Sequence, residues 1–283
     1  MPFADNRGEN LWVAYLGPAG TFTEEAASRY APQATLVPCS TIGASAEAAR
    51  IGAAHRAVVP IENSLQGAVT DTLDVLIHGE GLKVCHELAI PIVHTLMTKP
   101  GTSSADITRV CSHPQALAQC REYLAKHYPE ATVAASLSTA AAVEQAMAAT
   151  GVAAIAPRRA AELYGAEILD EGIQDVENNV TRFVVLAAAD HPPTGDDKTS
   201  ICISFDEDKP GQLFGVMEEF ARRELNLSKI ESRPTRLGLG KYYFLVDIDG
   251  HREDPAVQEV LAAVERKASM LKVFGSYPRF RLA

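Results

Sequence analysis

The sequence predicts an α/β protein with two parts, a larger N-terminal part of alternating strands and helices and a small C-terminal part. Apolar, strand-like runs alternate with helix-like segments through residues 1–189, which predicts a mainly parallel arrangement of the strands. A segment rich in Pro, Asp, Thr and Gly follows at residues 190–198, which we interpret as a linker. Because the first part is long and has no strong break, we expect two lobes that flank a cleft rather than one sheet.

The composition is that of an ordinary soluble protein, with 47% hydrophobic and 22% charged residues. Residues 1–197 carry 12 Lys and Arg against 23 Asp and Glu, a net −11, whereas residues 198–283 carry 14 against 13, a net +1. Neither part offers the basic face that nucleic acid requires, so we expect no nucleic-acid partner.

The cysteines and the N-terminus indicate a cytoplasmic protein. The five cysteines show no Cys-x-x-Cys pair and no spacing typical of zinc sites, so we interpret them as buried, reduced side chains. Residues Met1–Asn10 lack the apolar core of a signal peptide, and no apolar run is long enough to cross a bilayer. We therefore expect a cytoplasmic location and no membrane partner.

Three helix starts carry hydroxyl residues. Thr21 follows strand 12–16, and Thr21 with Glu24 three residues later fits a capping box. Ser112 with Gln115 fits a second box, and Ser138–Thr139 begins a third helix. Helix N-termini attract anions through unpaired N–H groups and partial positive charge. If all three face one cleft, they predict a small polar or anionic ligand, held by local donors despite the acidic surroundings.

One polar cluster follows an apolar strand, and a second precedes another apolar strand. Glu62, Asn63 and Ser64 come directly after strand 57–61, at the carboxyl end where open α/β sheets bind ligands. The cluster Asn178–Phe183 precedes the apolar strand 184–186, and such polar groups are costly to bury unless their hydrogen bonds are met. A capping loop and a polar edge strand are the alternative interpretations.

The segment after Ser112 carries further polar candidates. Gln115 and Gln119 are four residues apart and lie on one helix face, and Pro114 fits the first helical turn. His113 fits a role in stabilising this turn better than the role of a catalytic base.

The C-terminal part has a recognisable order. Strand 200–205, a helix from about Gly211, strands 227–236 and 242–248, a second helix and a last strand near 271–274 follow one another. This βαββαβ order predicts a ferredoxin-like domain.

Four blocks in order resemble the signature of prephenate dehydratase. They are Tyr15–Thr23, Val59–Gly67, Ser112–Leu117 with Gln119–Cys120, and Asn179–Phe183. The C-terminal part resembles the ACT regulatory domain of that family, and Glu231–Pro234 matches its phenylalanine-site motif. The resemblance extends from about Trp12 to Pro278.

This resemblance implies conversion of prephenate to phenylpyruvate, with loss of carbon dioxide and the ring hydroxyl, in L-phenylalanine biosynthesis. It implies no cofactor and no metal, a cleft between two lobes similar to periplasmic binding proteins, and feedback regulation by L-phenylalanine through an ACT domain at residues 199–283. Because few residues precede Trp12, we expect a monofunctional enzyme without a mutase domain.

The resemblance gives catalytic roles to Thr181, Glu62, Asn63 and Gln119. By family analogy Thr181 donates a hydrogen bond or a proton to the departing hydroxyl, although an alcohol is a very weak acid. Glu62 is the alternative donor if the cleft desolvates its carboxyl group. The expected substrate-binding residues are Thr21, Phe22, Ser64, Ser112, His113, Gln115, Ser138, Thr139, Arg182 and Phe183.

Strand alternation refines two of these expectations. Phe183 shares a face with Thr181 and could wall the pocket, whereas Arg182 points to the opposite face. Arg182 is therefore at least as well suited to a structural ion pair as to the substrate.

The family also implies a set of effector-binding residues, namely Gly211, Gln212, Leu213, Asn226, Leu227, Glu231, Ser232, Arg233 and Pro234. The family motif usually has Gly-Ala-Leu where this chain has Gly-Gln-Leu at 211–213, which leaves the direction and size of the phenylalanine effect open. Gly211 is expected to allow close approach. Such domains usually pair, so we expect a homodimer or a homotetramer.

Two other classes of function stay open on the sequence alone. A non-catalytic protein that binds a small carboxylate could use the same cleft, but it would not need a hydroxyl beside Glu62. A regulatory amino-acid sensor would need an output element, and no DNA-binding motif or basic patch is visible. Formation of phenylpyruvate distinguishes the enzyme from both.

Overall fold

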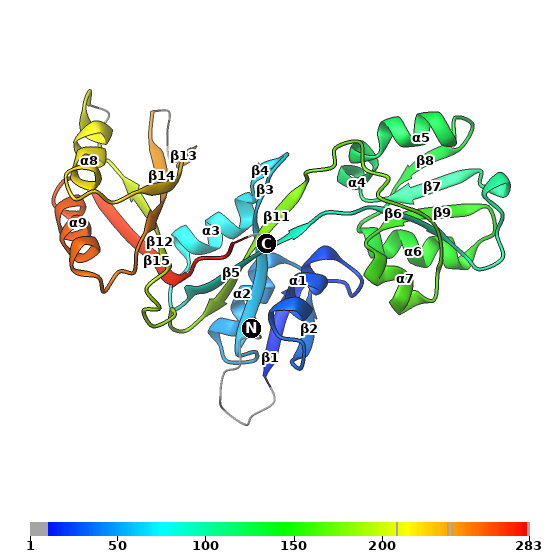
Figure 1. Cartoon of the computed structure of the whole chain (residues 1–283), viewed down its shortest axis with the longest axis horizontal. Helices are drawn as coiled ribbons and strands as arrows, with labels where there is room; N and C mark the ends of the chain where they lie inside the picture. The colour runs from blue at the N-terminus through cyan, green and yellow to red at the C-terminus, as the bar shows by residue number, and fades with distance from the viewer. Residues whose placement is uncertain (1–10, 208, 237, 239, 282–283) are drawn as a thin grey trace. The chain divides into compact units, whose positions relative to one another are not determined.

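The computed structural model describes residues 11–207, 209–236, 238 and 240–281 (Figure 1). The expectation about Met1–Asn10 lies outside these residues. Over the described part of the chain, no helix is long and apolar enough to cross a membrane. The chain divides into two compact units, residues 1–70 with 88–183 and residues 71–87 with 184–283.

The first sheet has the strand order β2-β1-β3-β11-β5, with β4 paired to β3. β1 pairs in parallel with both β2 and β3, so the carboxyl ends of β1 and β3 lie at one edge of the sheet. The central residues Val13 and Ala14 are fully buried. The elements are β1 (Trp12–Leu16), α1 (Phe22–Tyr30), β2 (Thr35–Cys39), α2 (Ile42–Arg50), β3 (Arg56–Asn63), β4 (Gly67–Ala68), β5 (Lys83–Pro91) and β11 (Val180–Ala187).

The second sheet, in the first unit, has the order β10-β6-β9-β7-β8. β7 is parallel to β8 and β9, but β6 is antiparallel to β9 and β10. The sheet is therefore mixed, where the sequence had favoured a mainly parallel one. Its elements are β6 (Thr95–Thr98), η1 (Ser104–Asp106), β7 (Arg109–Ser112), α4 (Pro114–Gln119), α5 (Arg121–His127), β8 (Thr132–Ala135), α6 (Thr139–Ala148), β9 (Val152–Ala156), α7 (Arg158–Tyr164) and β10 (Glu167–Glu171).

Helices cover both faces of this second sheet. Ala154 and Ala156 of β9 belong to a core cluster with α6 and α7, whereas Ala153 and Ile155 belong to a cluster with α4 and α5 (Figure 1). This alternation follows from the period of two along a strand, and both faces are apolar because both are covered. The pair of α/β lobes predicted from the sequence is confirmed.

The second unit contains the predicted βαββαβ domain. Its sheet has the order β13-β14-β12-β15, and helices α8 and α9 supply residues to the same core as β12 and β14. β12 already begins at Asp197, so the last two residues of the predicted linker 190–198 belong to a strand. The elements are α3 (Thr70–His78), β12 (Asp197–Ser204), α8 (Gln212–Ala221), β13 (Leu227–Pro234), β14 (Tyr242–Asp249), α9 (Pro255–Glu265) and β15 (Met270–Pro278).

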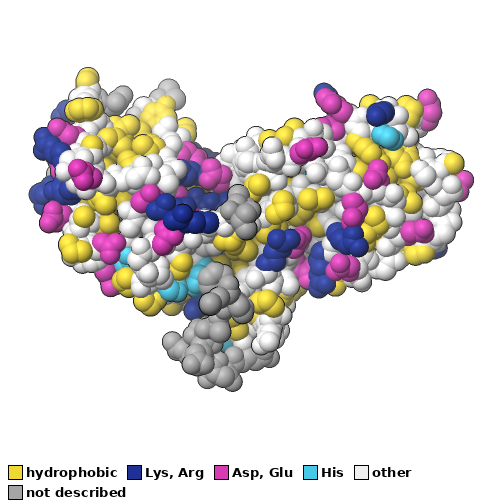
Figure 2. All heavy atoms as spheres, in the orientation of Figure 1, with side chains coloured by type: hydrophobic (Ala, Val, Ile, Leu, Met, Phe, Trp, Pro, Cys, Tyr) yellow, Lys and Arg dark blue, Asp and Glu magenta, His cyan; other side chains and the backbone are white. Residues whose placement is uncertain are grey.

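Several charged side chains on the surface form ion pairs. On the face shown in Figure 2, basic and acidic side chains lie interspersed. Ion pairs such as Arg29–Glu25 (2.6 Å) and Arg222–Glu218 (2.7 Å) join neighbouring helical turns.

Candidate active site

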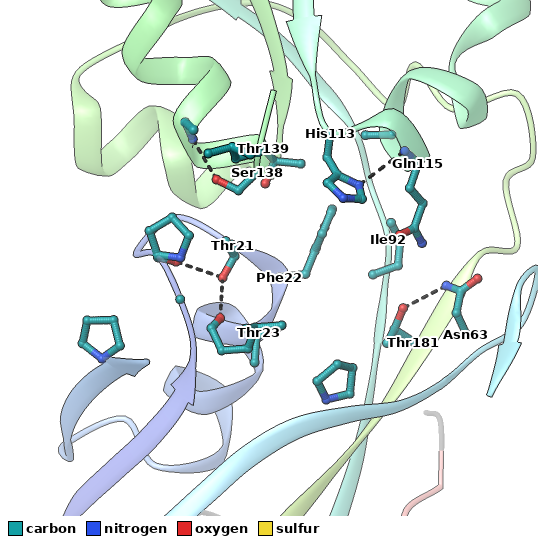
Figure 3. A pocket seen from close by; sticks show the side chains of 18 of the residues that line it. Thr21, Phe22, Thr23, Asn63, Ile92, His113, Gln115, Ser138, Thr139 and Thr181 are labelled. Atoms are coloured by element: carbon teal, nitrogen blue, oxygen red, sulfur yellow. Dashed lines mark hydrogen bonds between the residues drawn. The ribbon is translucent and has the colours of Figure 1, made fainter. Parts of the chain in front are cut away.

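A pocket of about 730 Å³ lies in the first unit (Figure 3). This volume is in the usual range for sites of small molecules. Four of the residues predicted from the sequence, Glu62, Ser64, Ser112 and Arg182, are not among the lining residues. The predicted residues that do line the pocket are Thr21, Phe22, Asn63, His113, Gln115, Gln119, Ser138, Thr139, Thr181 and Phe183.

A hydrogen-bonded carboxamide orients the hydroxyl group of Thr181. The Oδ1 atom of Asn63 accepts bonds from the backbone N–H groups of Leu65 (3.0 Å) and Gln66 (3.1 Å). Because a backbone N–H group can only donate, the other carboxamide atom, Nδ2, must be the donor. This Nδ2 donates to Thr181 Oγ1 at 2.9 Å (Figure 3). The Thr181 oxygen thus accepts from Asn63, and its own O–H hydrogen is left for an acceptor in the pocket.

The orientation of Asn63 fixes the direction of the bonds beyond it. Asn63 Nδ2 also donates to Asn179 Oδ1 at 2.7 Å, so the Nδ2 of Asn179 is a donor as well. It donates to Gln119 Oε1 at 3.1 Å, and the same oxygen lies 2.7 Å from His94 Nε2. A continuous chain of three carboxamides therefore joins Thr181 to His94.

Backbone hydrogen bonds hold the start of β11 in place next to the three carboxamides. Ile92 N–H donates to the Asn179 carbonyl at 2.8 Å, and Ser64 N–H donates to the Val180 carbonyl at 2.9 Å. Val180 N–H in turn donates to Ser64 Oγ at 2.9 Å. The predicted substrate residue Ser64 therefore ties β3 to β11 instead of lining the pocket.

Strand alternation divides the residues of β3 and β11 between two faces. Asn63, Thr181 and Phe183 line the pocket, and Phe183 is 1% exposed. On the other face Arg182 Nη1 lies 3.6 Å from Glu62 Oε2. Arg182 thus forms an ion pair, and neither Arg182 nor Glu62 is among the residues that line the pocket. Their roles in substrate binding and proton donation stay predictions.

The helix starts at α1 and α6 match the predicted capping. Thr21 Oγ1 accepts from Glu24 N–H at 3.4 Å, and Ser138 Oγ accepts from Ala141 N–H at 3.0 Å. In a capping box Glu24 would accept from the backbone N–H of Thr21. Here Glu24 Oε2 instead accepts from Gly20 N–H at 2.5 Å. Both helix starts contribute lining residues, so their first-turn N–H groups adjoin the pocket (Figure 3).

The expected cap at Ser112 is wrong by one residue. Ser112 is the last residue of β7, fully buried, and its Oγ donates to the Ile155 carbonyl at 2.6 Å. The N-cap of α4 is His113, whose Nδ1 accepts from Gln115 N–H at 3.3 Å. His113 therefore stabilises the turn, as expected, and also lines the pocket.

The pocket wall carries little charge. Among the described lining residues there is no Asp, Glu, Lys or Arg, and the histidines are His94 and His113. Burial lowers the pKa of His94, and its hydrogen bond to Gln119 opposes this shift only in part. His94 is therefore neutral near neutral pH, and the described wall of the pocket offers a ligand N–H groups, hydroxyls and carboxamides.

Two residues of the site were missed by sequence reasoning. His94 lies in the link between β5 and β6 and packs edge-on against the Phe22 ring, with the ring centroids 5.6 Å apart. Asn179 lies within the polar cluster that the sequence singled out, yet it was not placed in the site. The available signal was that each is a polar residue next to an apolar strand.

The predicted effector residues lie in the second unit, and several of them contact other residues of that unit. Gly211 precedes α8 with φ +86°, a backbone conformation that favours glycine, and its expected role in close approach stays a prediction. Gln212 Oε1 accepts from Lys209 N–H at 3.1 Å, and Arg233 Nη2 lies 2.5 Å from Asp74 Oδ1 of α3. Leu227 packs against the core of the domain.

Most of the remaining predicted effector residues lie on or next to β13, an edge strand of the sheet β13-β14-β12-β15. Asn226 Nδ2 donates to Asp249 Oδ2 at 2.8 Å, and Lys229 Nζ lies 3.0 Å from Glu231 Oε2. Ser232 and Pro234 are exposed on β13, and Leu213 is half-buried on α8. An effector role for this set stays a prediction.

The fold and the site together define a class: an α/β protein with a pocket of small-molecule size, lined by hydroxyl and carboxamide groups, and a C-terminal ferredoxin-like domain. The family model for prephenate dehydratase matches residues 13–191, and the model for the ACT domain matches residues 207–266. The chain belongs to the prephenate dehydratase family.

Individual relatives agree over nearly the full length. A prephenate dehydratase from Mycolicibacterium vanbaalenii is 40% identical, over 94% of this chain and 90% of the relative. The crystal structure of a prephenate dehydratase from Arthrobacter aurescens in complex with L-Phe has a TM-score of 0.85 at 39% identity, covering 95% and 90% of the two chains. A quorum-quenching acylase, GqqA, has a TM-score of 0.86 at 28% identity, covering 95% and 98%.

Proposed function

We propose that this chain converts prephenate to phenylpyruvate, carbon dioxide and water in the pocket of Figure 3, as a step of L-phenylalanine biosynthesis. The observation that carries the proposal is the direction of the Asn63–Thr181 hydrogen bond, which leaves the hydroxyl hydrogen of Thr181 for the substrate. A hydrogen-bond donor is what a departing hydroxyl group requires.

In this reaction the bond between the ring and its carboxylate breaks, and its electron pair becomes part of the aromatic ring. The ring hydroxyl leaves from the opposite carbon with its bonding electrons and takes up one proton to become water. Thr181 donates the hydrogen bond to this oxygen and relays the proton, which solvent ultimately supplies. An alcohol is too weak an acid to act alone, so a relay fits Thr181 better than a free-standing acid.

The uncharged wall of the pocket suits this chemistry. The carboxylate that departs as carbon dioxide loses its negative charge on the way to the transition state. A Lys or Arg paired with that carboxylate would stabilise the substrate more than the transition state and would slow the reaction. The apolar side chains of Phe22, Ile92 and Phe183 and the lack of cations among the described lining residues favour loss of this charge.

The carboxylate of the pyruvyl side chain keeps its charge and needs donors throughout. The N-terminal turns of α1 and α6, capped by Thr21 and Ser138, adjoin the pocket and supply N–H groups and partial positive charge. We propose that these turns bind this carboxylate, with Phe22, Thr139, His113, Gln115 and Gln119 completing the contacts.

A product assay tests the proposal directly. Purified protein incubated with prephenate should release phenylpyruvate, detected by its enol absorbance and by mass spectrometry. Binding of prephenate without turnover would favour a carboxylate-binding protein and refute the enzymatic proposal. Because GqqA, of similar fold, is described as an acylase, the same preparation should be assayed against an acylated amide, for which we expect no turnover.

The remaining proposals concern regulation and organisation. We propose that L-phenylalanine binds the C-terminal domain and inhibits the enzyme by feedback, because the similar Arthrobacter structure contains L-Phe. We further propose a homodimer or homotetramer, a cytoplasmic location, and the boundaries 1–189 for the catalytic domain, 190–198 for the linker and 199–283 for the ACT domain. Calorimetry with L-phenylalanine tests effector binding, and absence of heat at about millimolar ligand would count against it.

A further inference from the structure

His94 is a buried histidine whose role the reaction scheme has not used. It is 2% exposed, lines the pocket and packs its ring edge-on against Phe22. Its Nε2 atom lies 2.7 Å from Gln119 Oε1, and its backbone N–H donates to Gln174 Oε1 at 2.9 Å. Its Nδ1 atom is buried, and among the described residues it has no hydrogen-bond partner.

The hydrogen-bond directions determine the tautomer of this ring. Gln119 Oε1 is an acceptor, because the Nδ2 of Asn179 donates to it, and that direction follows in turn from Asn63. An acceptor at 2.7 Å requires the proton on His94 Nε2. The neutral ring then keeps no proton on Nδ1, so no N–H group is buried there without an acceptor.

We propose that His94 is a positioning residue for the dehydration: as the Nε2–H tautomer it anchors Gln119 and so maintains the carboxamide chain that directs the Thr181 hydroxyl hydrogen to the substrate. The proposal rests on the proposed function. His94 stabilises the acceptor orientation of Gln119, which leaves the Gln119 Nε2 amide group to face the other way. Without His94, the Gln119 carboxamide can rotate by half a turn. Asn63 keeps its bonds from Leu65 and Gln66, but Asn179 loses its fixed acceptor on Gln119, so Asn179 and Asn63 are held less firmly beside Thr181.

Steady-state kinetics of two substitutions test this role. His94→Leu fills a similar volume without a donor, and we expect kcat to fall about 10- to 100-fold while KM changes by less than about threefold. His94→Gln brings an amide N–H group near the position of Nε2 and should recover most of the lost kcat. Val152→Ala, in the core of the second lobe and outside the pocket, is the matched control for loss of packing.

Three results would overturn the proposal. The first is a kcat for His94→Leu equal to that of Val152→Ala at equal thermal stability. The second is a failure of His94→Gln to exceed His94→Leu, and the third is an effect confined to KM.

A spectroscopic measurement separates this proposal from the proposed function. In ¹⁵N-labelled protein the two ring nitrogens of His94 give distinct shifts for the two neutral tautomers. We expect the Nε2–H form, and we expect the Asn63→Leu substitution to broaden or shift its signal. This outcome does not depend on turnover of prephenate. If the wild-type protein does not turn over prephenate, the proposed function fails while the tautomer assignment stands; an Nδ1–H tautomer would refute the positioning role even in an active enzyme.

Discussion

The carboxamide nitrogen of Asn63 donates to the hydroxyl oxygen of Thr181 over 2.9 Å, and the backbone N–H groups of Leu65 and Gln66 fix the direction of that bond. Two local loop bonds thus determine what Thr181 can offer to a ligand. The same two bonds propagate through Asn179 and Gln119 to the tautomer of His94. The chemical polarity of the site is therefore set by the turn that follows β3.

Asn63→Asp tests this polarity with almost no change in shape. The carboxylate can still accept from Leu65 and Gln66, but it cannot donate to Thr181, whose hydroxyl hydrogen would turn toward it. We expect kcat to fall about 100-fold or more at neutral pH, the size seen when one preorganised donor is removed from an active site. Activity that rises as the pH is lowered would fit reprotonation of Asp at this position, whereas full activity at neutral pH would contradict the assigned direction.

Glu62 and Arg182 should matter little for turnover. They form a 3.6 Å ion pair on the face of β3 and β11 away from the pocket, and both side chains are partly exposed. We expect Glu62→Gln to keep kcat within about threefold and to lower the free energy of unfolding by about 1 kcal/mol or less. Kinetics and urea unfolding check this. A Glu62→Gln enzyme without activity would restore Glu62 as the proton donor.

The stability of the protein should depend on pH through His94. Burial holds its pKa in the folded state below the ordinary value of 6.5. In the unfolded state the ring takes up its proton near that value, so below about pH 6.5 the unfolded state binds more protons than the folded state. The free energy of unfolding therefore falls as the pH drops below about 6.5. For a single proton the slope is at most about 1.4 kcal/mol per pH unit.

Urea unfolding of wild-type protein and His94→Gln at about pH 7.5 and about pH 5.5 isolates this contribution. We expect the wild-type protein to lose more stability over this interval than the variant, because Gln does not titrate. Equal losses in the two proteins would show that the ring is already charged or that its pKa is not lowered.

Gly275 should tolerate no side chain. It lies in β15 with φ +149°, and a Cβ atom at this position would overlap the backbone carbonyl of Val84 in β5. We expect Gly275→Ala to lower the free energy of unfolding by about 2 kcal/mol or more, because neither backbone can yield without breaking strand contacts. Gly195→Ala is the matched control, since its φ is also positive (+90°) but its Cβ position is open. Equal destabilisation by both would show that backbone strain alone is responsible.

The features that the sequence predicted correctly are those that depend on neighbouring residues. The caps at Thr21 and Ser138 follow from side chains three positions from the N–H groups they bind. The βαββαβ order of the C-terminal domain follows from apolar periodicity, which each element carries in its own residues. Phe183 and Arg182 were assigned to opposite faces by alternation alone, and the structure agrees.

Two departures from the expected site were displacements of a single residue. Ser112 and His113 are both able to cap a helix, and the sequence does not show that β7 continues through Ser112. Likewise Glu62 and Asn63 are adjacent in β3, and only the pleat determines which of them faces the pocket. A shift by one position in a strand reverses the face, so local composition was insufficient.

The hydrogen bonds that link the polar residues into a chain had no local signal. Its links join residues far apart in the sequence, such as Asn63 to Thr181 and His94 to Gln119. The mixed direction of the second sheet was missed for the same reason, because strand direction depends on pairing across the fold and not on the residues of one strand.

The most direct test of the central claim is the kcat of Thr181→Val for prephenate, measured beside Thr181→Ser. Val keeps the shape of Thr and lacks the hydroxyl, whereas Ser keeps the hydroxyl and lacks the methyl group. We expect Thr181→Val to lose about 100-fold or more in kcat and Thr181→Ser to stay within about tenfold of the wild type. A Thr181→Val enzyme with near-normal kcat would show that another group assists the departing hydroxyl.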